Sequence, residues 1–179
     1  MKLGASKKTL VSAFVLSRLD YCNSLLSGSP KHLLEKLQKV QNSAARLVLR
    51  ANKWDHVSPL HRTLHWLPIQ ARMKYKLSTL CHSFFSDTAI VYLSVLLRVY
   101  SPSWQLRSSS DSRTLCIPHI KIKTVGHRSL SNAAPSVWNS LPHEIRGIQL
   151  TTAFKTALKT HLFKSYLYLL NLYSINLFL

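Results

Sequence analysis

The chain has 179 residues, 46% of them hydrophobic, so it is long enough and apolar enough to fold around a core. Its 24 Lys and Arg residues outnumber six Asp and Glu residues, which gives a formal net charge of +18 at pH 7. This composition argues against a wholly disordered chain and favours a polyanionic partner, either nucleic acid or an anionic membrane surface. A piece cut from a larger protein, separated from its acidic neighbours, would show the same imbalance.

The spacing of apolar residues predicts two helices within the first fifty residues. Between residues 6 and 26 they recur at steps of three and four, and Gly28 then provides a helix stop. Ser29 and Pro30 are typical N-cap and first-turn residues of a second helix that runs to about Arg50. Two helices joined by a short turn form a helical hairpin. The second helix has a basic outer face, which fits simple solvation as well as it fits binding.

Further helical patterns occupy the middle of the chain. Residues 55–87 predict a short helix, a break near Pro68 and a second helix, and residues 89–100 are helical or mixed. Residues 101–112 are rich in Ser and predict a linker.

The last third of the chain predicts a different organisation. Alternating Ile and Lys within residues 114–124 indicates one or two short strands, with Pro118 placing the first at a sheet edge. Helices are expected over 129–138 and 151–167. We therefore predict a mainly α fold. Its parts are a helical region (1–100), the linker (101–112), a small α+β C-terminal extension (113–165) and an apolar tail (166–179) too short to span a bilayer alone.

The chain offers little for catalysis. Metal-dependent polymerases and nucleases need converging carboxylates, whereas successive acidic residues here are at least fifteen positions apart. The four glycines form no phosphate-binding loop, and no G-x-S-x-G nucleophile motif occurs. We expect no catalytic residue and no cofactor.

Two partial metal motifs are weak. His61 and His65 have the spacing of a zinc protease, but an arginine stands where the catalytic glutamate would be. Cys116 and His119 form a half site with His127 nearby, without an obvious fourth ligand. We expect no bound metal.

Cysteine usage and the N-terminus indicate an intracellular protein of the nucleus or cytoplasm. The three cysteines form no C-x-x-C pair, and the first residues have no apolar secretory segment. These cysteines are Cys22, Cys81 and Cys116.

Tryptophans interleave with basic residues, as they do in proteins that stack on nucleic-acid bases. The four are Trp54, Trp66, Trp104 and Trp138. For Trp66 and Trp138, which stand at predicted helix ends, we favour the alternative that they anchor the core.

Five blocks in order resemble the C-terminal region of reverse transcriptases from LINE-type non-LTR retrotransposons, similar to the Rex-like and related vertebrate elements. The blocks are SRLDYCNSLLSGSP (17–30), LQKVQNSAARLVLR (37–50), DHVSPLHRTLHWLPIQARMKYKL (55–77), AAPSVWNSLPHEIR (133–146) and FKTALKTHLF (154–163). The resemblance covers about residues 9–167, whereas the apolar tail departs from the family pattern.

The resemblance implies that the helical hairpin belongs to the polymerase thumb, which packs against the primer–template duplex. It implies phosphate contacts from the basic residues of the hairpin, and the basic turn at 72–76 adds three more candidates. The candidate nucleic-acid-binding residues are Arg18, Lys31, Lys36, Lys39, Arg46, Arg50, Arg72, Lys74 and Lys76.

The resemblance also implies what the chain lacks. In the family, the palm with its magnesium-binding aspartate pair and an endonuclease domain precede the matched region, and this sequence has no Asp-Asp pair. We therefore expect a non-catalytic fragment that binds an RNA–DNA duplex, a DNA duplex or RNA without reading sequence. The alternative is an inert or partner-dependent fragment that needs the palm in order to fold, and a weaker one is membrane-surface association through the tail.

Overall fold

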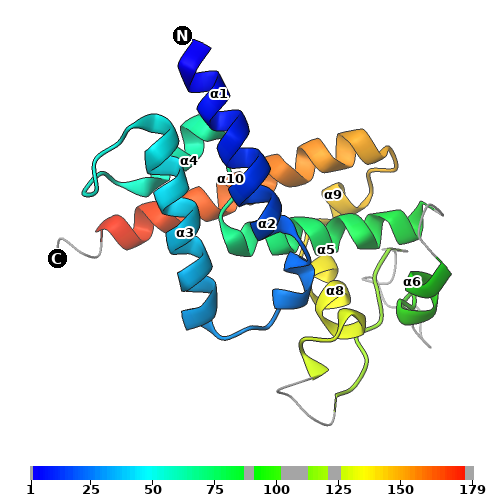
Figure 1. Ribbon diagram of the computed structural model, residues 1–179. Coiled ribbons are helices and arrows are strands. Elements are labelled where there is room, and N and C mark those ends of the chain that lie inside the picture. Colours follow the sequence, from blue (N-terminus) through cyan, green and yellow to red (C-terminus); the bar gives the residue numbers. More distant parts are fainter. Residues whose placement is uncertain (1, 87–90, 102–112, 121–125, 176–179) are drawn as a thin grey trace. The chain divides into compact units, whose positions relative to one another are not determined.

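The computed structural model is mainly helical (Figure 1). It describes residues 2–86, 91–101, 113–120 and 126–175. Chain contacts divide the protein into two compact units, which are described separately. The first unit comprises residues 1–23, 29–72 and 162–179, and the second unit comprises residues 24–28 and 73–161.

The first unit begins with one continuous helical segment. It consists of α1 (Lys2–Val11), a π-helical turn η1 (Ser12–Leu16) and α2 (Ser17–Asp20). The segment ends at Tyr21, whose ψ of 120° is extended. The predicted helix over residues 6–26 is thus confirmed as far as Asp20, beyond which Cys22 adopts a left-handed φ of 51° and a short 3-10 turn, η2 (Asn23–Leu26), follows.

Helix α3 (Lys31–Leu49) packs against α1 and η1, so the predicted pair of helices is confirmed. At its start the N–H groups of Leu33 and Leu34 donate to the carbonyl of Pro30, at 3.0 and 3.4 Å. At its end Arg50 is left-handed, with a φ of 54°, and its N–H donates to the carbonyl of Arg46. Both ends agree with the sequence prediction to within about one residue.

The core of the first unit lies between these helices and α4 (Val57–Leu64). A left-handed residue, His65, ends α4, and α5 (Ile69–Phe85) follows after the predicted break at Pro68. The core side chains are apolar and buried, which stabilises the fold by roughly 1.5–3 kcal/mol for each large side chain. They are Val11, Leu16, Ala44, Ala45, Val48, Leu64 and Trp66.

The second unit contains most of α5 together with shorter helices and the start of α10. Its remaining helices are α6 (Val91–Leu96), α8 (Leu130–Asn139), α9 (His143–Arg146) and α10 (Thr151–Ile175). In its core Trp138 stacks on Phe85 at 5.4 Å and His82 stacks on Phe154 at 4.1 Å between ring centroids. Trp138 also donates from Nε1 to the carbonyl of Arg113 at 2.6 Å. The prediction that Trp66 and Trp138 anchor the core is therefore confirmed.

The strands predicted within residues 114–124 are not supported. Residues 113–120 form no strand but a single antiparallel bridge, between Val99 and Leu115, and residues 121–125 lie outside the described residues. The reason is a side-chain amide: Asn139 accepts from the Leu115 N–H at 3.0 Å and donates to the Leu115 carbonyl at 2.8 Å. These contacts satisfy backbone groups that a neighbouring strand would otherwise bind, and Pro118 has no N–H to extend a ladder.

Two further expectations concern the ends of the predicted regions. Helix α10 continues to Ile175, through most of the segment predicted as an apolar tail. The division at residues 101–112 stays a prediction, because 102–112 lie outside the described residues. Within the described part of the chain, each helix is either too short or too polar to cross a membrane.

Candidate nucleic-acid interface

Four cations form a stripe along α3. Lys36, Lys39, Arg46 and Arg50 follow one another at steps of three, seven and four residues. At 100° per residue Lys36, Lys39 and Arg46 fall within an arc of about 80° and extend over about 15 Å along the helix axis, and Arg50 follows at the left-handed C-cap. We call these four residues the basic stripe. Helical periodicity, rather than long-range folding, brings them together.

The four side chains of the basic stripe differ in solvent exposure and in the hydrogen bonds that they already make. Lys36, Lys39 and Arg50 are exposed. Arg46 is half-buried, and its Nη2 donates to the backbone carbonyl of Asp55 at 3.2 Å. Its Nε is buried without a hydrogen-bond partner among the described residues. Three of the four side chains are therefore ready to meet a phosphate, while Arg46 also ties α3 to the following loop.

Two other candidates lie outside the stripe in the same unit. Arg18 is exposed on α2. Lys31 is exposed in the first turn of α3 and pairs with Glu35 at 3.8 Å, one helical turn further on. Such a solvent-exposed pair contributes little energy and does not prevent Lys31 from binding another anion.

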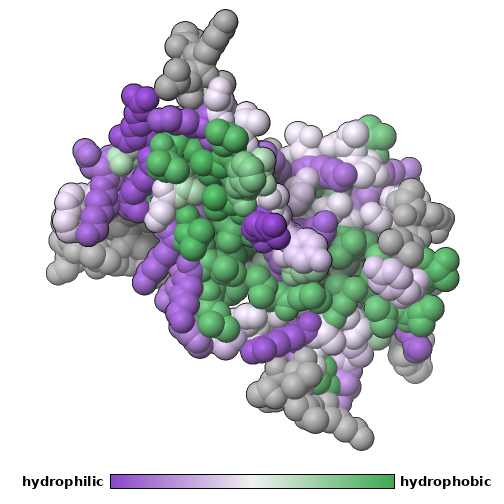
Figure 2. Space-filling view, viewed as in Figure 1, coloured by the Kyte–Doolittle hydropathy of each residue, from purple (hydrophilic) through white to green (hydrophobic). Residues whose placement is uncertain are grey.

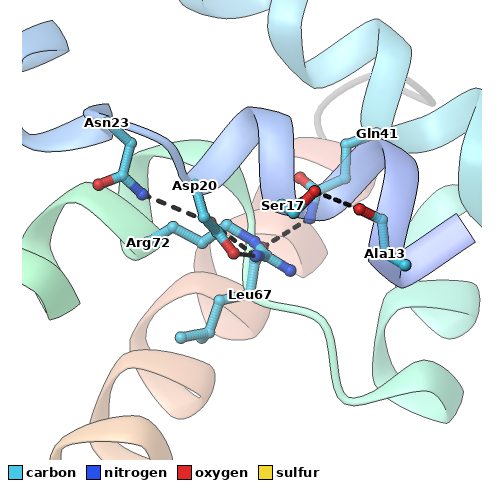
Figure 3. A network of polar contacts seen from close by, with 7 residues as sticks. All are labelled: Ala13, Ser17, Asp20, Asn23, Gln41, Leu67 and Arg72. Carbon is cyan, nitrogen blue, oxygen red and sulfur yellow. Dashed lines mark hydrogen bonds and ion pairs between the residues drawn. The ribbon is translucent and has the colours of Figure 1, made fainter. Parts of the chain in front are cut away.

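Arg72 is already occupied by contacts within its own unit (Figure 3). Its Nη1 donates to both carboxylate oxygens of Asp20, at 2.8 and 2.6 Å, and its Nε donates to the carbonyl of Leu67 at 2.8 Å. Asn23 donates to the same carboxylate at 3.4 Å, and only 14% of the Arg72 side chain is exposed. The structure thus assigns Arg72 to joining α2 and α5 rather than to an open surface.

The last two candidates belong to the other unit. Lys74 and Lys76 are exposed on α5 within the second unit, so we do not group them with the basic stripe.

The carboxylates of the first unit are engaged elsewhere. Asp20 binds Arg72, Glu35 pairs with Lys31, and Asp55 accepts from the N–H of Asn52 at 2.7 Å. No ion pair joins any of these three carboxylates to the basic stripe in the described residues. Among the described residues, the cations of the basic stripe are therefore not neutralised by a direct ion pair.

No protein family, curated protein or solved structure matches this chain. The likeness to LINE-type reverse transcriptases therefore rests on the five sequence blocks alone.

A cluster of amide side chains on the inner side of α3, of which Gln41 is buried and Gln38 and Asn42 are half-buried, was not anticipated from the sequence. Gln38 donates from Nε2 to the side-chain oxygens of Gln41 and Asn42, at 3.1 and 2.8 Å. Gln41 is fully buried and donates to the carbonyl of Leu67 at 2.8 Å, the same carbonyl that Arg72 binds. Figure 3 shows Gln41 and Arg72 approaching Leu67 together. A signal was present, because Gln41 falls on the apolar face of α3 in the sequence pattern.

The amide cluster includes a neutral histidine. His61 is 3% exposed, and its Nε2 lies 3.0 Å from Oδ1 of Asn42. Burial, with the positive charge of Arg72 adding to it, lowers the pKa of His61 to about 4. The imidazole is therefore uncharged at neutral pH.

The partial metal motifs do not assemble into a site. His61 is buried in α4, whereas His65 is exposed in the left-handed residue that ends this helix. Cys116 and His119 are both exposed. No group of three potential metal ligands occurs in the described portion of the chain.

Trp54 is the most exposed tryptophan of the described chain. Its side chain is 86% exposed in the loop after α3, and the Lys53 ammonium lies 5.3 Å from the ring centroid. An exposed indole beside a cation fits base stacking. Trp104, the remaining member of the predicted set, lies outside the described residues.

Proposed function

We propose that this protein binds the phosphate backbone of nucleic-acid duplexes through the basic stripe of α3, without reading sequence and without catalysing a reaction. The observation that carries the proposal is that Lys36 and Lys39 are exposed on one face of α3 and Arg50 is exposed at its C-cap, and that none of the three forms an ion pair with a carboxylate of the described residues. The resemblance to a polymerase thumb supports the same assignment, with an RNA–DNA or DNA duplex or structured RNA as the partner.

The stripe sets the expected salt dependence. Three exposed cations of α3 and Arg18 give about four phosphate contacts, and each contact releases counterions from a duplex. The logarithm of the association constant should then fall with the logarithm of salt concentration with a slope of roughly −3 to −4. Affinity should depend little on base sequence, because phosphate contacts position a protein without specifying bases.

Charge reversal tests the stripe directly. The double variant Lys36→Glu, Lys39→Glu should weaken binding to an RNA–DNA duplex at low salt by more than about tenfold and lower the salt slope by about two. The measurement is fluorescence anisotropy with duplexes of one length and several sequences.

A matched control distinguishes the loss of contacts from the basic stripe from the effect of a lower net charge. Lys155→Glu, Lys159→Glu makes the same charge change at two exposed positions of α10 in the second unit. We expect it to lower affinity by less than about threefold. Equal losses in both double variants, or no duplex binding at low salt by the unaltered protein, would rule the proposal out.

The non-catalytic part of the proposal has its own test. The chain has no pair of neighbouring carboxylates for two-metal polymerase chemistry. Purified protein supplied with primer–template, nucleotides and Mg²⁺ should give no primer extension. Extension that survives repurification would contradict this part of the proposal.

A second candidate function rests on exposed apolar side chains of the first unit. Phe14 is 72% and Leu47 is 63% exposed, and Leu33 and Val40 continue the Leu47 row along α3. Figure 2 shows hydrophobic side chains gathered over η1 and α3, with hydrophilic side chains beside them. We infer that this face packs against another protein surface, for which the polymerase palm implied by the resemblance is the candidate.

The second candidate makes a distinct prediction. If the face needs a protein partner, then the double variant Phe14→Ser, Leu47→Ser should reduce self-association and improve solubility while leaving duplex affinity unchanged. Analytical ultracentrifugation at increasing protein concentration measures the first effect. A protein that is monomeric before the substitutions, and unaffected by them, would remove the reason for this candidate.

A further inference from the structure

The loop between α3 and α4, in the first unit, is organised by short hydrogen bonds (Figure 1). Arg50 is left-handed, and the N–H of the next residue, Ala51, donates to the carbonyl of Arg46 at 3.1 Å. The N–H of Asn52 donates to Oδ2 of Asp55 at 2.7 Å, and the N–H of Asp55 donates to the carbonyl of Asn52 at 3.2 Å. These bonds close a tight turn over residues 52–55, and Arg46 Nη2 ties its last carbonyl to α3 at 3.2 Å.

This turn presents an indole to solvent. Lys53 and Trp54 are its two central residues, because the closing hydrogen bond runs from residue 55 back to residue 52. The Trp54 side chain is 86% exposed, whereas Trp66 and Trp138 are 5% and 0% exposed. Tryptophan is among the more buried residue types on average, so an indole held in water by a closed turn indicates a surface that binds a partner.

The charges near the indole favour nucleic acid over an apolar protein surface as that partner. The Lys53 ammonium lies over the Trp54 ring at 5.3 Å from its centroid, and Arg50 is exposed four residues earlier. The carboxylate of this loop, that of Asp55, accepts a hydrogen bond from the N–H of Asn52. Aromatic rings beside cations bind single strands by stacking on bases and contacting phosphates, whereas an apolar surface would have to desolvate the ammonium.

Trp54 lies next to the C-terminal end of the basic stripe. Arg46 Nη2 is 3.2 Å from the carbonyl oxygen of Asp55, and consecutive Cα atoms are about 3.8 Å apart. The Cα atom of Trp54 is therefore within about 10 Å of the Arg46 guanidinium. Successive nucleotides of one strand are about 3.4 Å apart along a duplex axis. The indole thus reaches a base only a few nucleotides from the phosphates that the basic stripe holds.

The cost of exposing a base decides which base the indole can bind. Bases inside a duplex are stacked on both faces, so an indole reaches one only after the base has been extruded. Extrusion costs about as much free energy as one stack between a base and an aromatic side chain supplies. An unpaired base just beyond the end of the duplex needs no extrusion. The basic stripe together with Trp54 therefore fits the junction at which a duplex continues as a single strand.

We propose that Trp54 stacks on an unpaired base at a junction between duplex and single strand, while the basic stripe holds the phosphates of the adjoining duplex. This inference rests on the proposed function and names its substrate class, a duplex with a single-stranded overhang. One stack strengthens binding by about 5- to 150-fold. Every base offers a flat face, so the preference is for an unpaired base and not for one sequence.

The test compares three probes by fluorescence anisotropy with the full chain at low salt. The first is a blunt RNA–DNA duplex, and the second is the same duplex with a short 3′ or 5′ overhang of adenosines. The third has an overhang of equal length without bases, so that it keeps the phosphates and loses only the stacking surface. In at least one polarity the adenosine overhang should bind at least about fivefold more tightly than the abasic one. Equal affinities in both polarities would overturn the proposal.

Variants assign the preference to the indole. Trp54→Ala should lower the affinity for the adenosine overhang to that for the abasic overhang, and Trp54→Phe should keep part of the difference. The side chain is 86% exposed, so its removal leaves the core intact. Tyr92→Ala removes an aromatic side chain that is 58% exposed in the second unit and should leave the preference unchanged. A preference that survives Trp54→Ala overturns the proposal.

Tryptophan fluorescence supplies a second readout. Stacking on a base quenches an indole, so the adenosine overhang should quench the unaltered protein more than the abasic overhang does. Trp54→Phe should remove this additional quenching, and quenching that persists in this variant would contradict the assignment.

The outcomes separate this inference from the proposed function. Lys36→Glu, Lys39→Glu should weaken binding to all three probes and keep the ratio between the adenosine and abasic overhangs. Absence of binding to every probe rules out the proposed function and this inference with it. Binding to all three probes with equal affinity, still weakened by the charge reversal, overturns this inference alone.

Discussion

Acidification should destabilise this protein through one buried imidazole. His61 has a pKa of about 4 in the folded chain against 6.5 for an unperturbed histidine. Between these two values the unfolded chain binds a proton that the folded chain does not, so the free energy of unfolding falls as the pH falls from about 6.5 to about 4. The stabilisation is fully present above pH 6.5.

The size of the effect follows from the difference between the two pKa values. A difference of about 2.5 units corresponds to about 3 kcal/mol, with a slope approaching 1.4 kcal/mol for each pH unit below pH 6. The side chain is 3% exposed, so solvent screens this penalty little. A loss of this size is a substantial part of the stability of a typical domain.

The assay is urea unfolding at pH 7.0, 6.0, 5.0 and 4.5 for the unaltered protein and for His61→Gln, which keeps a donor toward Asn42. Other titrating groups are common to both proteins and cancel in the difference. His65→Gln, at an exposed position, is the control. Equal pH slopes in the unaltered protein and His61→Gln would refute the reasoning, as would an NMR titration of the His61 ring with a midpoint near 6.5.

Two further predictions concern backbone conformation and thiol reactivity. Gly28 has a left-handed φ of +75°, so Gly28→Ala should lower the free energy of unfolding by about 1–2 kcal/mol. Gly147 has a right-handed φ of −69°, so the control variant Gly147→Ala should change this free energy by less than about 0.5 kcal/mol. Chemical denaturation measures both effects. Burial raises the pKa of the Cys81 thiol to about 12. A thiol reagent at pH 8 should therefore modify the exposed Cys22 and Cys116. Cys81 should stay unmodified until the protein unfolds. Modification of all three thiols at one rate would contradict the second prediction.

The sequence was sufficient for the local elements of the first unit. The start and end of α3 follow from Pro30 and from the apolar spacing between Leu34 and Val48, and both are decided by interactions within a few residues. The basic stripe is equally local, because helix geometry alone places Lys36, Lys39 and Arg46 on one face of α3.

Long-range contacts decided the features that the sequence did not reveal. The sequence indicated a strand that includes Leu115, but the side chain of Asn139, 24 residues further on, binds the Leu115 N–H and carbonyl groups that a neighbouring strand would otherwise bind. In the same way, Arg72 looked equivalent to Lys74 and Lys76 in one basic turn. Its ion pair with Asp20, 52 residues away, distinguishes it from them.

The sequence by itself determined where helices form and which cations share a helix face, because both depend on spacing along one element. Only the tertiary structure decided which of those cations remain available, since Asp20 and the carbonyls of Leu67 and Asp55 are brought to them by folding. It also decided the hydrogen-bonding state of His61. That state depends on the orientation of the Asn42 side chain, which Gln38 sets. Gln38 is oriented in turn by the backbone N–H of Ile69 at the start of α5. The contacts of Asn42 with His61 and of Gln38 with Ile69 join residues far apart in the sequence, so no local pattern predicts them.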